Sequence, residues 1–211
     1  MKELVIIGAG GFGREVYNLA LETNDYGSKF IIKGFLDDNK NALDSFENYK
    51  PIIGSVNDYG IESNDVFVCA MGNVVQKEKC VTMIKKKGGE FISLIHPTAH
   101  IGINTEIGVG SIVCFNACIS CDVTIGNFVS IQPFAALGHD VKVGDWCHLN
   151  AYAFLGGRVE VLERATIHTG AIVVPQKKVA EESIVGANSV VIRNVKKGKT
   201  VFGIPADYIE F

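Results

Sequence analysis

The second half of the chain carries a six-residue period that constrains its fold more than any other feature. Stepping by six from Ile101 to Val191 gives sixteen positions, and every one of them is Ile, Val or Leu. These three residue types fill 57 of the 211 positions, so a run of sixteen arises by chance with a probability of about 10⁻⁹, against a period typical of hexapeptide solenoids. The period therefore predicts a solenoid of short parallel strands.

A second position in each hexapeptide supports this prediction. Two residues before each aliphatic residue stands a small or β-branched residue, with Lys177 as the one exception. Residues two apart on a strand share a face, so each pair points into the core together. Three hexapeptides complete one triangular coil, and we therefore expect residues eighteen apart to stack on each other.

The first half of the chain lacks this period and alternates expected strands with expected helices. Leu4–Ile7 is typical of a buried strand, and the run Gly8–Gly13 that follows it fits the pattern GxGxxG. We expect helices at Arg14–Glu22 and 74–87, and further strands at Ile31–Leu36, Val66–Ala70 and Phe91–Ile95. This alternation predicts a small parallel α/β domain with half of a dinucleotide-binding (Rossmann) sheet.

The sequence thus divides into three parts, with a boundary at His96-Pro97 because proline discourages continuation of the preceding element. We expect the half-Rossmann α/β domain at 1–95, a parallel β-helix at 96–194 and a short C-terminal tail at 195–211. The glycine-rich loop followed by Asp37 and Asp38 fits a nucleotide, and a mononucleotide suits the length better than NAD. The alternative is a plain tight turn between strand and helix.

Charge and hydropathy exclude several classes of protein. Twenty basic and 23 acidic residues give a net charge of −3, so the basic footprint of a nucleic-acid binder is missing. The apolar run Leu4–Ile7 is too short for a signal peptide or a membrane span. We therefore expect a cytoplasmic protein without a membrane span.

The most conspicuous interruption of the solenoid pattern lies at His139-Asp140. His139 stands two residues past an inward Leu137, so we expect it at a corner, facing outward. Gly157 follows eighteen residues later and should stack on His139, leaving space and a backbone N–H beside the imidazole. Histidine accepts a proton near neutral pH, and Asp140 could fix its tautomer. The alternative is that both residues form a solvated corner.

At this point nearly the whole chain resembles a known family, the nucleotide-sugar N-acetyltransferases of the bacillosamine type, within the sialic acid O-acetyltransferase family of hexapeptide acyltransferases. The matching segments are Ile7–Gly13, Phe35–Asp38, Met71–Asn73, Leu94–His96, His139–His148 and Gly203–Ala206. The resemblance implies a left-handed β-helix, a homotrimer, and acetyl-CoA bound in the groove between neighbouring β-helices.

The same resemblance implies roles for individual residues. His139 matches the general base, Asp140 the acid that orients it, and His148 a second active-site histidine. For acetyl-CoA, Gly157 matches a backbone donor to the thioester oxygen, and Gln132 falls where some members carry an asparagine. The nucleotide-sugar pocket would comprise Gly10, Gly11, Phe12, Gly13, Asp37, Asp38 and Asn73. Phe12 stands where some relatives carry a histidine, which leaves the identity of the sugar open.

Alternatives remain at this stage. O-acetylation of a sialic acid or another sugar is one, and the sequence fixes neither the sugar nor its nucleotide. A β-helix zinc protein of the γ-carbonic anhydrase kind is another, although His139 and His148 are nine residues apart and that class uses a closer pair; we expect no metal. A nucleotide-sugar sensor that uses only 1–95 is a third. The basic residues near the C-terminus either bind CoA phosphates or face solvent: Arg193, Lys196, Lys197 and Lys199.

Overall fold

The computed structural model describes residues 1–209 and divides the chain into two compact units, Met1–Pro97 and Thr98–Phe211. The division falls two residues beyond the boundary drawn after residue 95. Neither helix of the described residues has the length and apolar character needed to cross a bilayer.

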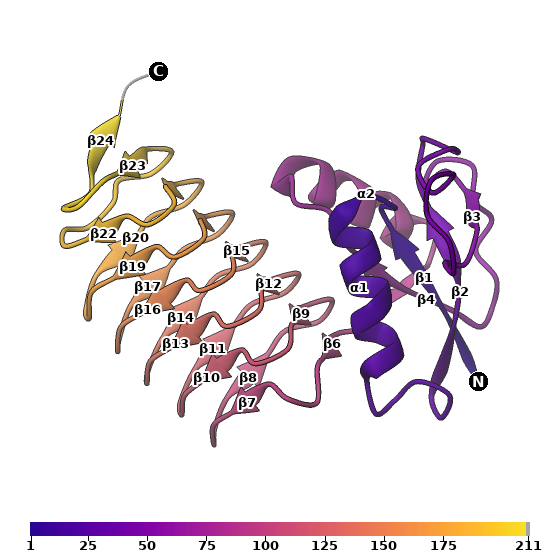
Figure 1. Ribbon diagram of the computed structural model, residues 1–211, viewed down its shortest axis with the longest axis horizontal. Helices are drawn as coiled ribbons and strands as arrows, with labels where there is room; N and C mark the ends of the chain where they lie inside the picture. Colours follow the sequence, from indigo (N-terminus) through magenta and orange to yellow (C-terminus); the bar gives the residue numbers. More distant parts are fainter. Residues whose placement is uncertain (210–211) are drawn as a thin grey trace. The chain divides into compact units, whose positions relative to one another are not determined.

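The first unit is built on a parallel five-stranded sheet with the strand order β3-β2-β1-β4-β5 (Figure 1). Its elements are β1 (Lys2–Ile7), α1 (Gly11–Glu22), β2 (Phe30–Leu36), β3 (Ile52–Gly54), β4 (Asp65–Cys69), α2 (Val74–Lys86), β5 (Glu90–Phe91) and β6 (Leu94–Ile95). The prediction of a half-Rossmann α/β domain is confirmed, with three local differences. Helix α1 begins at Gly11, three residues early; β3 was not expected; and the expected strand Phe91–Ile95 is broken into β5 and β6.

The central strands of this sheet explain why the unit folds as it does. Every residue of β4 is buried, and so are the last four of β1. A strand buried on both faces carries a continuous apolar run instead of an alternating one, which is what parallel sheets with helical cover require. The carboxyl ends of β1, β2 and β4 therefore share one edge, where the loops after Ile7, Leu36 and Cys69 meet.

The second unit is a parallel β-helix whose strands are two residues long. Its repeats form β7 (His100–Ile101), β8 (Glu106–Ile107), β9 (Ile112–Val113), β10 (Cys118–Ile119), β11 (Thr124–Ile125), β12 (Ser130–Ile131), β13 (Ala136–Leu137), β14 (Lys142–Val143), β15 (His148–Leu149), β16 (Phe154–Leu155), β17 (Glu160–Val161), β18 (Thr166–Ile167), β19 (Ile172–Val173), β20 (Lys178–Val179), β21 (Ile184–Val185) and β22 (Val190–Val191). The aliphatic position of each hexapeptide is the second residue of one strand, which confirms the period.

Three faces surround a core formed by these aliphatic residues and the small residues two positions before them. The C face has the strand order β22-β19-β16-β13-β10-β7, the D face has β20-β17-β14-β11-β8, and the B face runs from β21 through β18, β15 and β12 to β9. Strands eighteen residues apart pair in parallel, as Ala136 does with Phe154. Corner residues such as Asp140 and Arg158 adopt a left-handed conformation (φ 59 and 61).

The segment 195–211, expected as a tail, continues the solenoid as far as it is described. β23 (Thr200–Phe202) pairs in parallel with β21, and β24 (Asp207–Ile209) turns back antiparallel to β23. The B face is thus extended at the C-terminal end of the helix. Residues 210–211 of the expected tail lie outside the described residues.

Candidate active site

His139 and Asp140 lie at a solenoid corner between β13 and β14 and contact each other. The Nδ1 atom of His139 lies 2.7 Å from Oδ2 of Asp140, and both side chains are about half exposed. Neighbouring residues on a strand point apart, so this contact depends on the left-handed turn at Asp140. The hydrogen bond with His139 is the main reason that the pKa of Asp140 lies below its usual value, with a smaller contribution from the charge of Arg158. An ionised Asp140 can fix the Nδ1–H tautomer and leave Nε2 as the proton acceptor.

Gly157 stacks on His139 as the eighteen-residue spacing predicts. A Cβ atom built on Gly157 would lie 2.6 Å from Nε2 of His139, so any larger residue would displace the imidazole. Within residues 1–209 the Gly157 N–H donates no hydrogen bond. The next N–H, that of Arg158, donates to the carbonyl of His139 at 2.9 Å and fixes the two coils in register. The corner thus holds a base and an available backbone donor side by side.

His148 and Gln132 lie elsewhere on the solenoid. His148 belongs to β15 and Gln132 directly follows β12, so both are on the B face. His148 is only 3% exposed and lies in register between Ser130 and Thr166. The His139 corner joins the C and D faces, which places it across the triangular coil from the B face. One chain therefore does not bring His139 and His148 together.

In the first unit, Asp37 holds the glycine-rich loop. Its Oδ2 accepts a hydrogen bond from the Ala9 N–H at 2.8 Å, and its Oδ1 accepts one from Asn39 at 2.9 Å. Gly13 is required for packing, because a Cβ there would overlap the carbonyl oxygen of Gly8. A Cβ at Gly10 or at Gly11 would meet nothing within 4 Å, which leaves the N-terminus of α1 open to a ligand.

This helix end suits an anion. Gly10 is the N-cap of α1, it offers no capping side chain, and the first turn carries no acidic residue. Helix N-termini present backbone N–H groups and positive dipole ends, which bind phosphate. Phe12 lies in the same first turn and is partly buried.

Asp38 and Asn73 have different surroundings. Asp38 lines a pocket of about 440 Å³ together with Met71 and residues of α2, including Lys79 and Cys80. The Asn73 side chain caps α2 by accepting a hydrogen bond from the Gln76 N–H at 2.9 Å. Asn73 immediately before an expected helix was itself a capping signal, so this contact could have been read from the sequence.

The structure adds one residue that the sequence analysis did not single out. Arg158 lies one coil beyond Asp140 in the same corner column, and its Nε is 3.5 Å from Oδ2 of Asp140. The eighteen-residue step that led from His139 to Gly157 leads equally from Asp140 to Arg158. The signal was present, but it was applied only to the histidine.

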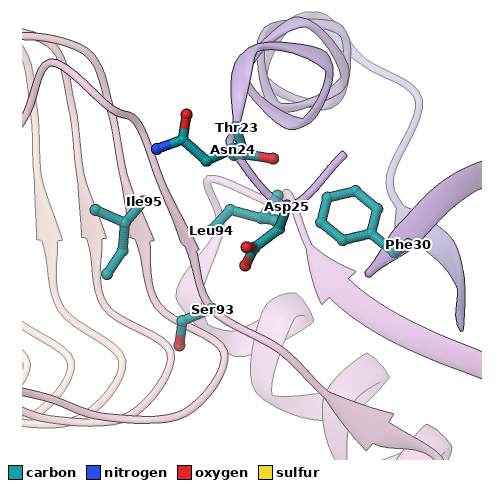
Figure 2. Close-up of a pocket in the computed structure, with 7 residues that line it drawn as sticks. All are labelled: Thr23, Asn24, Asp25, Phe30, Ser93, Leu94 and Ile95. Carbon is teal, nitrogen blue, oxygen red and sulfur yellow. The ribbon is translucent and has the colours of Figure 1, made fainter. Parts of the chain in front are cut away.

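Two other features of the first unit lie away from the sheet edge where the loops after β1, β2 and β4 meet. A pocket of about 190 Å³ lies beyond the C-terminal end of α1, lined by Thr23, Asp25 and Leu94 among others (Figure 2); it is at the opposite end of α1 from the glycine-rich loop. Among the described residues, Glu3, Glu62 and Asp65 could group as metal ligands, but the ammonium of Lys33 lies within 3.2 Å of all three carboxylates. The ammonium of Lys33 therefore already pairs with the three carboxylates, although it offsets only one of their three negative charges.

Comparisons with known proteins agree with the fold of both units. A family model described as the PglD N-terminal domain matches residues 3–84, and one described as the GMPPB C-terminal domain matches residues 90–185. None of the curated proteins compared with the chain matches it.

Solved structures match over the full length. The acetyltransferase domain of PglB from Neisseria gonorrhoeae, in complex with acetyl coenzyme A, is 29% identical with a TM-score of 0.88, and the match covers 99% of each chain. PerB from Caulobacter crescentus, in complex with CoA and GDP-perosamine, is 27% identical with a TM-score of 0.88, covering 100% of this chain and 98% of the other. WeeI from Acinetobacter baumannii, 24% identical over 99% of this chain and 100% of its own with a TM-score of 0.69, shares the fold.

The fold and the comparisons define the chain as a hexapeptide-repeat acyltransferase. Within this class, its first unit matches the PglD N-terminal domain, and the chain as a whole is similar to the acetyltransferase domain of PglB. The resemblance noted in the sequence is confirmed.

Proposed function

We propose that the chain transfers an acetyl group from acetyl-CoA to the amino group of a nucleotide-linked amino sugar, with the 4-amino position as the acceptor. It is an acetyl-CoA-dependent sugar N-acetyltransferase. The structural observation that carries the proposal is the solenoid corner where His139, oriented by Asp140, stacks on Gly157, which has no side chain. The relatives solved with acetyl coenzyme A, and with CoA and GDP-perosamine, support it.

The corner supplies what direct attack on a thioester needs. The amine nitrogen attacks the thioester carbon while Nε2 of His139 takes the proton that the nitrogen loses. The Gly157 N–H donates to the oxygen on which negative charge develops, an effect typically worth about 3 kcal/mol. When the C–S bond breaks, the imidazolium returns a proton to the CoA sulfur. No group of the enzyme forms a covalent intermediate.

The nucleotide part of the substrate is assigned to the first unit. The open N-terminus of α1 suits the phosphates, and the pocket beside Asp38 suits the base or ribose. Asp37 acts on the substrate indirectly, because both of its oxygens hold backbone N–H groups of the adjacent loops. For Gly10, Gly11 and Asp38 we retain the predicted role in substrate binding, and for Gly13 and Asn73 we assign support of the loop and helix that surround it.

A homotrimer forms part of the proposal. The outward residues of the C face include Cys118, Ala136, Phe154, Ile172 and Val190, whereas those of the D face are mostly charged. Phe154 and Ile172 are 44% and 38% exposed. An apolar face of this extent is typical of a surface that another chain covers.

An aromatic ladder extends this surface at the neighbouring corner. Phe134 and Tyr152 stack with ring centroids 5.0 Å apart, Phe115 packs edge-on against Phe134, and all three are exposed. Since His139 lies two residues past the end of the C-face strand β13, a chain that covers this face also borders the His139 corner. A second copy could then supply His148 and Gln132, which are distant from that corner in their own chain.

The proposal is tested by release of the CoA thiol with a panel of nucleotide-linked 4-amino sugars. We expect turnover with at least one of them, and mass spectrometry of the product distinguishes an amide from the ester that O-acetylation would give.

The His139→Ala variant should lower kcat by about 10² to 10⁴, the usual contribution of a general base, with a smaller loss for Asp140→Asn. Asp122→Asn, at the same corner one coil below, is the matched control. Near wild-type turnover by His139→Ala would overturn the mechanism.

The finer parts of the prediction stay proposals. The basic residues Arg193 and Lys196 line a pocket of about 260 Å³ at the C-terminal end of the solenoid, together with Tyr208, and a role toward CoA phosphates is one of two readings of them. We also propose a cytoplasmic location, as the sequence predicts, and cell fractionation tests it.

A further inference from the structure

Arg14 is held in place by an aromatic ring instead of an acid. Its guanidinium stacks on Phe46, with Cζ 3.4 Å from the ring centroid. Phe46 belongs to the loop between β2 and β3, where Asp44 and Glu47 flank it. Neither acid, nor any other carboxylate within residues 1–209, pairs with Arg14, and its guanidinium makes no hydrogen bond there. The free protein thus fixes the position of a cation and leaves its charge without a partner.

The place of this cation in the fold is electrostatically unfavourable for the free protein. Arg14 is the fourth residue of α1, whose first turn contains no acidic residue. The N-terminus of a helix carries a partial positive charge. Helical side chains tilt toward that end, so the Arg14 guanidinium is directed back toward the open backbone at Gly10 and Gly11. Two positive groups on one side of the glycine-rich loop indicate that an anion from outside the protein completes the arrangement.

The loop that carries Phe46 is itself ordered. The Phe46 N–H donates to the Leu43 carbonyl at 2.9 Å. Three residues further on, Tyr49 packs edge-on against Tyr17 of α1, with the ring centroids 5.1 Å apart. A ring that stacks on a guanidinium covers its flat face and leaves the N–H groups along its edge free. The stack therefore orders Arg14 before a ligand arrives, which lowers the entropic cost of binding.

We propose that Arg14, held by Phe46, binds the diphosphate of the nucleotide-linked substrate through paired hydrogen bonds. This inference rests on the proposed function, which assigns the nucleotide to the first unit. The planar guanidinium matches two phosphate oxygens at once, whereas a lysine ammonium offers a point charge. The contact favours nucleoside diphosphates over the corresponding monophosphates, because the second phosphate adds both charge and acceptor oxygens.

The test is calorimetric measurement of the Kd for GDP, UDP, dTDP and CDP, and for the monophosphate of whichever base binds most tightly. In Arg14→Gln we expect the Kd of the diphosphate to rise roughly tenfold to a hundredfold, the range for hydrogen bonds to a charged group. The preference for diphosphate over monophosphate should shrink with it. Arg14→Lys should fall between Arg14→Gln and the wild type. Phe46→Leu keeps the guanidinium but removes the ring, and it should weaken binding severalfold.

The matched control is Lys29→Gln, which removes one positive charge near the opposite end of α1. Lys29 pairs there with Asp25 at 2.9 Å, and the diphosphate Kd should stay unchanged. Two further readouts separate binding from folding: Arg14→Gln should keep its Tm within a few degrees and its KM for acetyl-CoA within about twofold, because the described residues give the guanidinium no acid to lose. A merely structural role would instead lower Tm and leave the preference for diphosphate as in the wild type.

The outcomes separate this inference from the proposed function. An unchanged diphosphate Kd in Arg14→Gln overturns the role of Arg14 and leaves the proposed function intact. A loss in Lys79→Gln would then identify the cation used instead, since Lys79 lines the pocket beside Asp38. An equal loss for diphosphate and monophosphate in Arg14→Gln overturns the contact with the diphosphate. If the wild type binds none of the four diphosphates, the proposed nucleotide site is wrong and the role of Arg14 falls with it.

Discussion

At the scale of single residues, the contact between Gly157 and His139 gives the sharpest prediction. Gly157 has no positive φ that would exclude alanine, but an added Cβ would lie 2.6 Å from Nε2 of His139. The half-exposed imidazole can swing aside, so the Gly157→Ala variant should keep its Tm within a few degrees while kcat falls by at least about tenfold. Thermal melts and CoA-release assays check this, with Gly60→Ala as control, since a Cβ there meets nothing within 4 Å. Unchanged kcat would mean that the ring does not act from this position.

Residue positions in the solenoid could be read from the sequence as far as the period was followed. The step of eighteen correctly stacked Gly157 on His139, because each coil repeats the one below it. The same arithmetic separates His139 from His148: nine residues are half a coil, so the two lie across the triangle from each other. That consequence follows from spacing alone, whereas the 3.5 Å approach of Arg158 to Asp140 depends on rotamers that a period does not specify.

At the scale of elements, the loop after β1 and the loop after β2 are coupled through Asp37. Removing its carboxylate leaves the Ala9 and Asn39 N–H groups without their acceptor, so Asp37→Ala should lower Tm by several degrees and raise the KM for the nucleotide sugar. Asp38 makes no such backbone contact in the described residues and lines the pocket, so Asp38→Ala should raise that KM with Tm nearly unchanged. Melting curves and initial rates distinguish the two. Equal effects on Tm would refute this division of roles.

The sequence predicted both aspartates as ligand-binding, and it could not tell them apart. Adjacent residues at the end of a strand are equally close to the glycine-rich loop, and the direction of each side chain depends on the turn that follows, here the bonds from Asp37 to Ala9 and Asn39. The broken strand at Phe91–Ile95 has a similar cause. Its apolar pattern is continuous, but β5 ends at Phe91 and β6 begins at Leu94, and hydropathy does not register such a break.

At the scale of the whole molecule, the positions of His139 and His148 predict an active site built from two chains. We expect His139→Ala and His148→Ala to be nearly inactive when each is prepared alone. In trimers assembled at random from equal amounts of both, a site that takes His139 from one chain and His148 from its neighbour is intact with a probability of about one quarter, as cyclic symmetry requires. CoA release should therefore recover to about a quarter of the wild-type rate.

A mixture made from separately folded, unexchanged trimers is the control and should stay inactive. If each site used both histidines of one chain, no mixed trimer would contain an intact site, and absence of recovery in co-assembled trimers, verified by mass, would refute the shared site.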